Sequence, residues 1–301
     1  MVRLSAVQLT SNSDVTDNLN RIAKILVELT NLPQAEQHIV VLPECCLFFG
    51  GKDTEQLVLA QKTAEHDENE LLKQLAHLAS NFNVTLVAGT IPILVGNKTN
   101  KENNKFYNRC CVFSPTGELL DFYNKMHLFD TAFKDKTIDL QGKHTTANYC
   151  ESTYAHAGEK TTVVSTPFAK LGLSVCYDLR FPELYRQLQQ QGADIITVPS
   201  AFTKVTGKSH WQALLQARAI ENQVFIIAAG QEGIHKNGRE TWGHSMIISP
   251  WGEILACQKY GEGFASVIVD LGEVEQIRAK MPVAKHNRFV VSLKSDKNNN
   301  Y

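Results

Sequence analysis

The hydrophobic and polar positions of the chain follow two alternating periods. Short apolar runs, typical of buried strands, are separated by stretches in which apolar residues recur every third or fourth position, as on an amphipathic helix. The predicted strands cover residues 3–9, 39–42, 84–89, 107–113, 118–123, 171–176, 194–198, 224–229, 244–249, 253–258 and 264–269. Strands that alternate with helices in this way predict an α/β fold in which helices cover sheets.

The predicted helices have recognisable residues at their ends. A helix that begins at Pro182 stops at Gly192, because proline suits a first turn and glycine suits a C-terminal cap. Ser209 and Gln212 are a possible capping box for another helix. The predicted helices cover residues 15–29, 71–82, 182–192, 209–222 and 272–280.

No linker rich in glycine, serine or proline divides the chain, which predicts a single domain over residues 1–293. The most irregular stretch is 130–150, a polar segment rich in lysine, threonine and aspartate. We interpret it as a long loop, which in a compact domain is usually functional or disordered. The polar residues 294–301 are predicted to form a frayed C-terminal tail.

Composition and charge exclude several classes of partner. The chain has 30 basic and 31 acidic residues and a formal net charge of −1, so no nucleic-acid surface is predicted. No apolar run is long enough to span a membrane, and the N-terminus lacks the pattern of a signal peptide. The seven cysteines, an odd number, make a poor disulfide framework, which predicts the cytoplasm. Neither the cysteines nor the ten histidines show metal-ligand spacing, so no metal is predicted.

Three reactive side chains each follow or end a predicted apolar strand, where sites in α/β folds usually lie. Glu44 ends the run Val-Val-Leu-Pro-Glu, and a partly desolvated carboxylate can act as a general base. Lys125 lies among aromatic and apolar residues, where a fixed ammonium group stabilises a developing oxyanion. Cys176 ends a strand shortly before a helix. The positive end of that helix and a nearby lysine are expected to lower the pKa of its thiol.

Each of these side chains also has an ordinary structural interpretation. A loop glutamate is usually solvated, a lysine can lie along an apolar strand with its charge in water, and a lone cysteine is usually buried and inert. None of the three segments indicates catalysis alone. Their order and their flanking residues together are far more specific.

Further segments surround these residues in the same order. They are Leu42-Pro43-Glu44, Asn124 to Asp130, Val175 to Glu183, Pro199 to Thr203, His210-Trp211, Ala217 to Asn222 and Gly243-His244-Ser245. From about residue 3 to about residue 290, this pattern resembles the nitrilase superfamily of carbon–nitrogen hydrolases. The resemblance implies a four-layer αββα sandwich and a hydrolase that acts on linear amides and needs no cofactor.

The resemblance also implies a role for each matched residue. Glu44 is implied as the general base, Lys125 as the oxyanion stabiliser and Cys176 as the nucleophile that carries a thioester. The backbone N–H of Tyr177 is implied as a second oxyanion donor. Many members have another glutamate near the triad, and Glu151 in the triplet Cys-Glu-Ser is the candidate here.

The expected substrate follows from the Nit branch of the superfamily, to which the chain is most similar. The resemblance implies deaminated glutathione, cleaved to α-ketoglutarate and cysteinylglycine, or as an alternative the omega-amidase substrates α-ketoglutaramate and α-ketosuccinamate. Arg180 is the candidate to bind the substrate carboxylate through two hydrogen bonds, with Phe202 and Thr203 beside it. In the alternative interpretation, Arg180 forms a structural ion pair with Asp178 or Glu183.

Two other interpretations come from different classes. Because some relatives are fused to or act with other proteins, the chain could be a catalytically silent scaffold, but all three triad residues are present. Nucleotide binding is disfavoured because the chain has no G-x-G-x-x-G motif. The resemblance further implies a homodimer or larger homo-oligomer. The segment between Asp130 and Glu151 is longer than in the Nit branch, which is expected to reshape the rim of the pocket.

Overall fold

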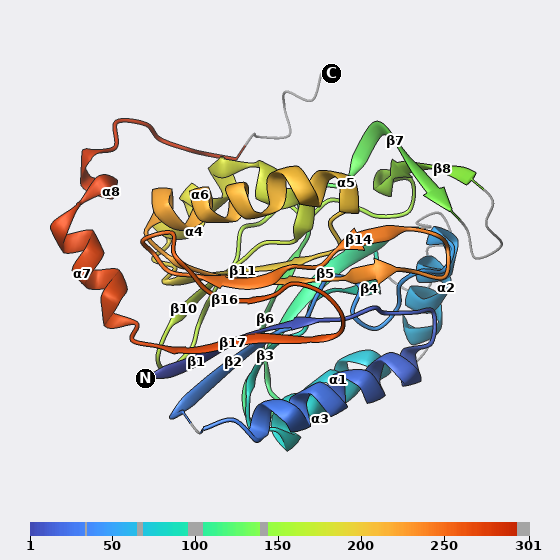
Figure 1. Cartoon of the computed structure of the whole chain (residues 1–301), viewed down its shortest axis with the longest axis horizontal. Coiled ribbons are helices and arrows are strands. Elements are labelled where there is room, and N and C mark those ends of the chain that lie inside the picture. Colours follow the sequence, from blue (N-terminus) through green and yellow to red (C-terminus); the bar gives the residue numbers. More distant parts are fainter. Residues whose placement is uncertain (34, 65–68, 96–104, 139–143, 294–301) are drawn as a thin grey trace.

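The computed structural model describes residues 1–33, 35–64, 69–95, 105–138 and 144–293 (Figure 1). Within these residues, two large sheets are formed. The first contains β1 (Val2–Gln8), β2 (Gln37–Val41), β3 (Thr85–Val87), β4 (Ile91–Leu94), β5 (Phe106–Phe113), β6 (Leu119–Asn124) and β17 (Gly263–Val269). It runs in the order β17-β1-β2-β3-β5-β4, and β6 pairs with β5.

The second sheet has the same mixture of parallel and antiparallel strands. It contains β9 (Val163–Ser165), β10 (Lys170–Leu173), β11 (Ile195–Ser200), β12 (Phe225–Gly230), β15 (Ser245–Ile248) and β16 (Ile254–Gln258). Its order is β16-β15-β12-β11-β10-β9, and β10, β11 and β12 are parallel. Every residue of β11 and β12 is buried, as expected for parallel strands that are covered on both faces.

Alternate residues of a strand reach different layers, because the side-chain period of a strand is two. Ile39 and Val41 of β2 belong to the core between the sheets, whereas Val40 and Leu42 pack toward the helices outside the first sheet. Residues 39–42 are therefore buried on both faces of the sheet. This is the physical reason that residues 39–42 are a continuous apolar run.

Helices cover the outer face of each sheet, as Figure 1 shows. α1 (Val15–Thr30) and α3 (Glu70–Asn81) lie on the first sheet, and α4 (Pro182–Gln190) and α6 (Gln212–Asn222) lie on the second. Ile22 of α1 and Leu75 of α3 are fully buried against the first sheet, and Leu188 of α4 and Leu215 of α6 are fully buried against the second. The layers confirm the predicted αββα sandwich.

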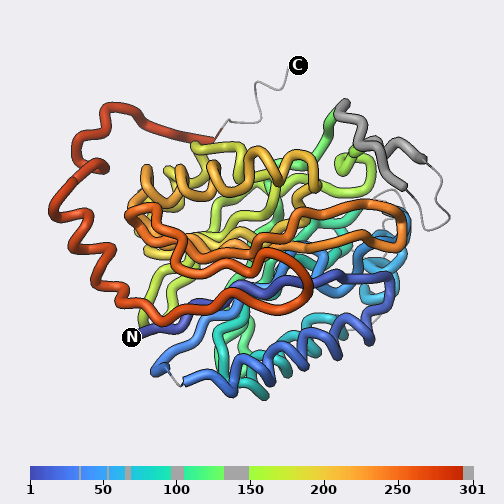
Figure 2. Tube along the Cα trace, in the orientation of Figure 1, coloured from blue at the N-terminus to red at the C-terminus, as the bar shows by residue number. Residues whose placement is uncertain are grey.

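The first and last strands of the described chain meet in the first sheet. β17 pairs with β1 in antiparallel register from Val2 opposite Val269 to Gln8 opposite Gly263, so the blue and red parts of the trace run side by side (Figure 2). α7 (Gly272–Lys280) and the short α8 (Val283–His286) follow. The predicted tail 294–301 lies outside the described residues, and the single domain over 1–293 stays a prediction. No helix within the described ranges combines the length and apolar character needed to cross a membrane.

The interpretation of residues 130–150 as an irregular loop is wrong for the part of the backbone that is described. β7 (Asp130–Ile138) and β8 (His144–Cys150) form an antiparallel pair, with Asp130 opposite Cys150 and Ile138 opposite His144. The segment is rich in threonine, whose branched side chain favours extended backbone even where the sequence is polar. A polar composition alone was therefore not sufficient evidence for an irregular loop.

The helix predicted to start at the Ser209–Gln212 capping box in fact starts earlier. A short helix α5 (Lys204–Thr206) leads through a π-helical turn, η3 (Gly207–Trp211), into α6. The residue that caps this run is Thr203, whose side chain accepts a hydrogen bond from the Thr206 N–H. Apolar periodicity also did not predict α2 (Asp53–Ala64) or the hairpin made by β13 (Glu232–Ile234) and β14 (Glu240–Trp242).

Candidate active site

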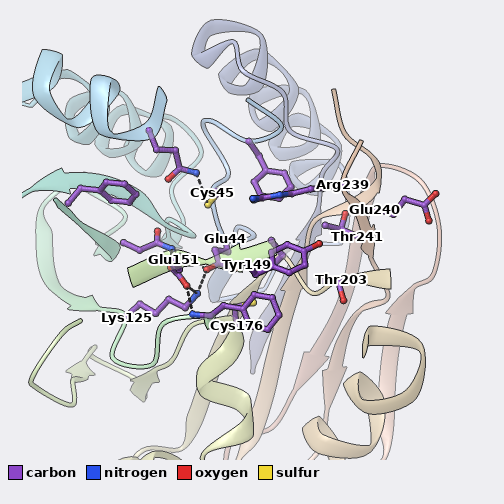
Figure 3. Close-up of a pocket in the computed structure, with 16 residues that line it drawn as sticks. Glu44, Cys45, Lys125, Tyr149, Glu151, Cys176, Thr203, Arg239, Glu240 and Thr241 are labelled. Atoms are coloured by element: carbon purple, nitrogen blue, oxygen red, sulfur yellow. Dashed lines mark hydrogen bonds and ion pairs between the residues drawn. The ribbon is translucent and has the colours of Figure 1, made fainter. Parts of the chain in front are cut away.

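The three predicted reactive residues meet at one edge of the stacked sheets. Glu44 follows β2, Lys125 directly follows β6, and Cys176 opens a short 3-10 helix, η2 (Cys176–Arg180), after β10. All three side chains are buried, with 4%, 2% and 8% of their surface exposed. Glu151 joins them from a 3-10 turn, η1 (Glu151–Thr153), after β8, and Figure 3 shows the four side chains converging.

Lys125 is held between two carboxylates. Its Nζ lies 2.8 Å from Glu44 Oε1 and 2.8 Å from Glu151 Oε2. Burial acts to lower the pKa of Lys125, but the charges of Glu151 and Glu44 outweigh it and hold the pKa well above its ordinary value. The side chain is therefore a fixed, buried cation of the kind that stabilises an oxyanion.

Backbone and amide groups fix the two carboxylates. Glu44 Oε2 accepts a hydrogen bond of 3.0 Å from the Ala201 N–H, and Glu151 Oε2 accepts one of 2.7 Å from the Phe129 N–H. The side-chain amide of Asn108 on β5 donates to both, at 3.1 Å to Glu44 Oε1 and 3.4 Å to Glu151 Oε1. Burial and the nearby charge of Glu44 raise the pKa of Glu151.

The backbone at Cys176 has a left-handed conformation with φ = +50°. A residue with a Cβ pays on the order of 1 kcal/mol for this conformation and keeps it only where the surroundings enforce it. The turn aims the sulfur into the site between the sheets and begins η2, whose first peptide N–H groups are not used by the helix itself. The N–H of Tyr177 is one of these groups, which is consistent with its predicted role as an oxyanion donor.

Asp178 ties the turn of the nucleophile to the segment that carries Lys125. Its buried carboxylate accepts hydrogen bonds from the Val175 N–H at 2.8 Å and the Tyr123 hydroxyl at 2.8 Å. It also contacts the His127 N–H at 3.1 Å and His127 Nδ1 at 2.7 Å. The Asp178 carboxylate therefore fixes the turn that carries Cys176 relative to the segment that carries Lys125.

The expectation that the thiol pKa of Cys176 is lowered is wrong. Burial raises it well above its ordinary value, and the carboxylate of Glu44 raises it further. Lys125 acts in the opposite direction, but its charge is shared with two carboxylates. The raised pKa favours the neutral thiol at Cys176, and the Glu44 carboxylate lies in the same buried cluster.

Two cavities adjoin Cys176. The larger has a volume of about 110 Å³, and its walls include Glu44, Cys45, Gln56, Asn108, Lys125, Phe129, Tyr149, Glu151, Thr203, Arg239, Glu240 and Thr241. The smaller has a volume of about 20 Å³ and is lined by Phe129, Tyr177, Arg180, Ala201, Phe202, Thr203 and Thr206 besides Cys176. A cavity of 20 Å³ holds about one water molecule or a group of carboxylate size. Both cavities therefore reach Cys176, and they share Phe129, Ala201 and Thr203 in their walls.

The predicted substrate-binding residues lie around the smaller cavity. The Arg180 guanidinium is 3.2 Å from His210 Nδ1 and 5.4 Å from the centre of the Phe202 ring. Within the described ranges it forms no ion pair with Asp178 or Glu183, so the alternative interpretation of Arg180 is wrong. Thr203 lines both cavities.

Sequence reasoning missed several residues of the larger cavity, namely Asn108, Tyr149 and Arg239. The dipeptide Asn237-Gly238 is a strong hairpin signal and predicts the turn that precedes Arg239. Nothing in the sequence indicates that this hairpin faces the site. In the part of the chain that the structure describes, no group of histidine, cysteine, aspartate and glutamate side chains is arranged to hold a metal ion.

Comparison with known proteins agrees with this geometry. Residues 3–279 match the carbon–nitrogen hydrolase family. Deaminated glutathione amidase from Synechocystis sp. is 43% identical over 288 residues, 95% of this chain and 98% of that protein. Omega-amidase NIT2-B from Xenopus laevis is 34% identical over 297 residues, 99% of each chain. The crystal structure of Saccharomyces cerevisiae Nit3, a member of branch 10 of the nitrilase superfamily, is similar with a TM-score of 0.78 at 31% identity, covering 96% of this chain and 97% of that one. The chain therefore belongs to the carbon–nitrogen hydrolase family.

Proposed function

We propose that this chain is an amidase that hydrolyses a small linear carboxamide through a thioester on Cys176. The observation that carries the proposal is the buried contact of Lys125 with Glu44 beside a neutral thiol at the wall of a cavity. A nucleophile, a base and a fixed cation are the groups that acyl transfer through sulfur requires. The intact and mutually positioned triad supports catalysis over the alternative of a silent scaffold.

The first half of the reaction forms the thioester. Glu44 accepts the thiol proton of Cys176 while the sulfur attacks the carbonyl carbon, and the carbonyl oxygen becomes an oxyanion. Lys125 Nζ and the Tyr177 N–H stabilise that oxyanion. When the C–N bond breaks, the protonated Glu44 donates its proton to the leaving nitrogen, so the amine departs neutral and the acyl group stays on sulfur.

The second half returns the enzyme to its resting state. Glu44 accepts a proton from a water molecule whose oxygen attacks the thioester carbonyl. The oxyanion again contacts Lys125. When the C–S bond breaks, the proton held by Glu44 returns to sulfur, and a carboxylic acid is released. Glu151 keeps the lysine charged and in place through both halves.

We propose deaminated glutathione as the substrate, with α-ketoglutarate and cysteinylglycine as products. The name of the Synechocystis relative supports this choice, and so does Arg180 at the smaller cavity, since a guanidinium binds a carboxylate through two parallel hydrogen bonds. The omega-amidase reaction on α-ketoglutaramate is the second candidate, because a relative with that name aligns over 99% of the chain.

A substrate panel tests the proposal and the role of Arg180. We expect a higher kcat/KM for deaminated glutathione than for α-ketoglutaramate, and a lower value for a neutral amide of similar size. Arg180→Lys should raise KM for both keto acids by about tenfold or more but change the neutral amide little, because lysine cannot reproduce the two-point contact. Release of cysteinylglycine or ammonia gives the rates. Preference for α-ketoglutaramate would favour the omega-amidase, and preference for the neutral amide would contradict carboxylate recognition.

We also propose that the protein is a homodimer or a larger homo-oligomer. Phe289 and Val290, near the end of the described chain, are 81% and 92% exposed. Adjacent exposed apolar side chains support a contact surface at this position. Light scattering at micromolar concentration should give at least twice the chain mass of 33.6 kDa, and a single-chain mass throughout would contradict the assembly.

The cytoplasm is the compartment that we propose. All seven cysteines are free, and those at positions 45, 46, 110, 111 and 176 are buried. Unpaired cysteines in this number suit a reducing environment. A disulfide in protein that is isolated under alkylating conditions would argue against it.

A further inference from the structure

We propose that Asn108 is a positioning residue of the amidase and that it makes Oε2 the proton-accepting oxygen of Glu44. The inference rests on the proposed function, in which Glu44 is the general base, and it names the atom of that base that takes part. Asn108 lies on β5, in the wall of the larger cavity, and is 4% exposed. Its side chain acts on the reaction through Glu44 and Glu151.

The two oxygens of the Glu44 carboxylate are unequally occupied. Each oxygen of a carboxylate has about two positions for a hydrogen bond. Oε1 accepts from Lys125 Nζ at 2.8 Å and from Asn108 Nδ2 at 3.1 Å, so both of its positions are occupied. Oε2 accepts from the Ala201 N–H at 3.0 Å, and among the described residues this is its one hydrogen bond. Oε2 therefore keeps a position for the thiol proton of Cys176.

Ala201 turns Oε2 toward the nucleophile. It directly follows β11 and lines both cavities together with Cys176. Because its N–H holds Oε2, this oxygen lies at the part of the wall that the sulfur shares. Lys125 and Asn108 hold Oε1 at the same time. The carboxylate of Glu44 is thus fixed at both oxygens, with one of them directed to the reacting atoms.

The Asn108 amide has one favourable orientation. Its Nδ2 donates to Glu44 Oε1 at 3.1 Å and to Glu151 Oε1 at 3.4 Å. The reversed amide would place Oδ1 against two carboxylates, which repel it. In the observed orientation Oδ1 is buried and has no hydrogen-bond partner among the described residues. An unpaired buried acceptor is unfavourable for stability, so the two hydrogen bonds to the glutamates determine how the amide lies.

The main chain around Asn108 joins the segments that carry Lys125 and Glu151. The Asn108 carbonyl accepts a hydrogen bond of 3.0 Å from the Lys125 N–H. Two residues earlier on β5, the Phe106 N–H donates to the Tyr154 carbonyl at 3.0 Å, and the Tyr154 N–H donates to the Glu151 carbonyl at 3.1 Å. The Asn108 amide is therefore held at a set distance from the charged side chains of both segments before a substrate binds.

An amide suits this position because it donates hydrogen bonds without adding charge. Lys125 is already in contact with both carboxylates. A second cation beside Glu44 would favour its ionised form further and make it a weaker base, whereas a third carboxylate would repel the other two. Asn108 fixes the geometry of the base and leaves its basicity to the existing charges.

Asn108→Leu tests the inference, because leucine is neutral and similarly branched but donates no hydrogen bond. We expect kcat for deaminated glutathione to fall by about tenfold to a hundredfold, as for a misplaced catalytic group, while KM changes by less than about twofold. Single-turnover kinetics should show slower formation and slower hydrolysis of the thioester, since Glu44 serves both. Alkylation of Cys176 by iodoacetamide, measured by mass spectrometry, should slow by a similar factor, because the thiol proton again has to move to Glu44.

Asn222→Leu is the matched control. Asn222 on α6 is 1% exposed, and its Oδ1 also has no hydrogen-bond partner within the described ranges. Its Nδ2 donates to the Arg218 carbonyl at 3.0 Å, and it lines neither cavity beside Cys176. This substitution should lower the thermal stability but keep kcat and the alkylation rate of Cys176 near their wild-type values.

The outcomes separate the inference from the function on which it rests. If Asn108→Leu keeps the wild-type kcat and alkylation rate, or if Asn222→Leu loses kcat to the same degree, the inference is wrong although the amidase function stands. A higher KM with unchanged kcat would also contradict it, since Asn108 would then contact the substrate. If the wild-type enzyme hydrolyses no amide of the panel, the proposed function fails, and the alkylation rate still tests Asn108. Asn108→Ala also removes both donors and should show the same losses if the leucine variant does not fold.

Discussion

Replacing Cys176 by alanine is expected to lower kcat for amide hydrolysis by at least about a thousandfold, because no other group can carry the thioester. The folded structure should survive. The substitution removes one sulfur atom from a side chain that is 8% exposed, and alanine has the same Cβ as cysteine in the left-handed backbone conformation at this position. Steady-state assays with deaminated glutathione and thermal denaturation measure the two properties.

Cys257 offers a matched control for the nucleophile. It is a free, half-buried cysteine on β16 and lines neither of the two cavities beside Cys176. Cys257→Ala should keep kcat close to the wild-type value. Mass spectrometry after a brief reaction should find an acyl adduct on the wild-type protein and none on Cys176→Ala. Substantial turnover by purified Cys176→Ala would show that the triad is assigned wrongly.

Glu44→Gln is expected to block both halves of the reaction, with a loss of kcat of about a hundredfold or more. Burial and the carboxylate of Glu44 raise the pKa of the Cys176 thiol, so the resting sulfur is protonated and cannot attack without a base. Glutamine keeps an oxygen for the Lys125 contact but cannot accept the proton. Single-turnover kinetics should show neither product nor acyl-enzyme.

The enzyme species that accumulates in single-turnover kinetics of Glu44→Gln shows which half of the reaction Glu44 serves. An acyl-enzyme that builds up in Glu44→Gln would mean that the glutamate serves only the hydrolysis of the thioester. Glu183→Gln, at an exposed glutamate in the first turn of α4, is the control with the same chemical change and should keep near wild-type kcat. Circular dichroism of both variants excludes loss of the fold as the cause.

Local patterns were sufficient to predict most elements and to single out Glu44, Lys125 and Cys176, which the structure brings to one cavity. The helix over Val15–Thr30 and the strand at Ile195–Ser200 follow from apolar periodicity alone, because each element packs its apolar positions against a neighbour regardless of which neighbour it is. The segments around Glu44, Lys125 and Cys176 were recognisable because each reactive residue is embedded in a specific run of flanking residues.

Patterning failed where the local backbone conformation depends on a hydrogen-bonding partner that the polarity of the segment does not reveal. Residues 130–150 are polar, yet β7 and β8 pair with each other, and the run that starts with α5 is capped at Thr203 rather than at Ser209. In both cases a hydrogen bond determines the local structure: the pairing of β7 with β8, and the Thr203 side chain with the Thr206 N–H. Polarity and a plausible capping pair could not reveal that partner.

Only the tertiary structure decided which charges of the site lie in contact, in which direction the thiol pKa shifts, and which residues line the cavity. Glu44, Lys125 and Glu151 are 81 and 26 positions apart along the chain, yet the ends of β2, β6 and β8 make them hydrogen-bonding neighbours. Stacking of the second sheet on the first then places Cys176 in the same cavity wall. Burial of the sulfur and the neighbouring carboxylate of Glu44 raise the thiol pKa, although the sequence predicted a fall. The same stacking brings the β13–β14 hairpin and Arg239 to the cavity. A sequence determines which side chains exist and which local structures they favour, but a charge acts through its distance to other charges, and those distances exist only after folding.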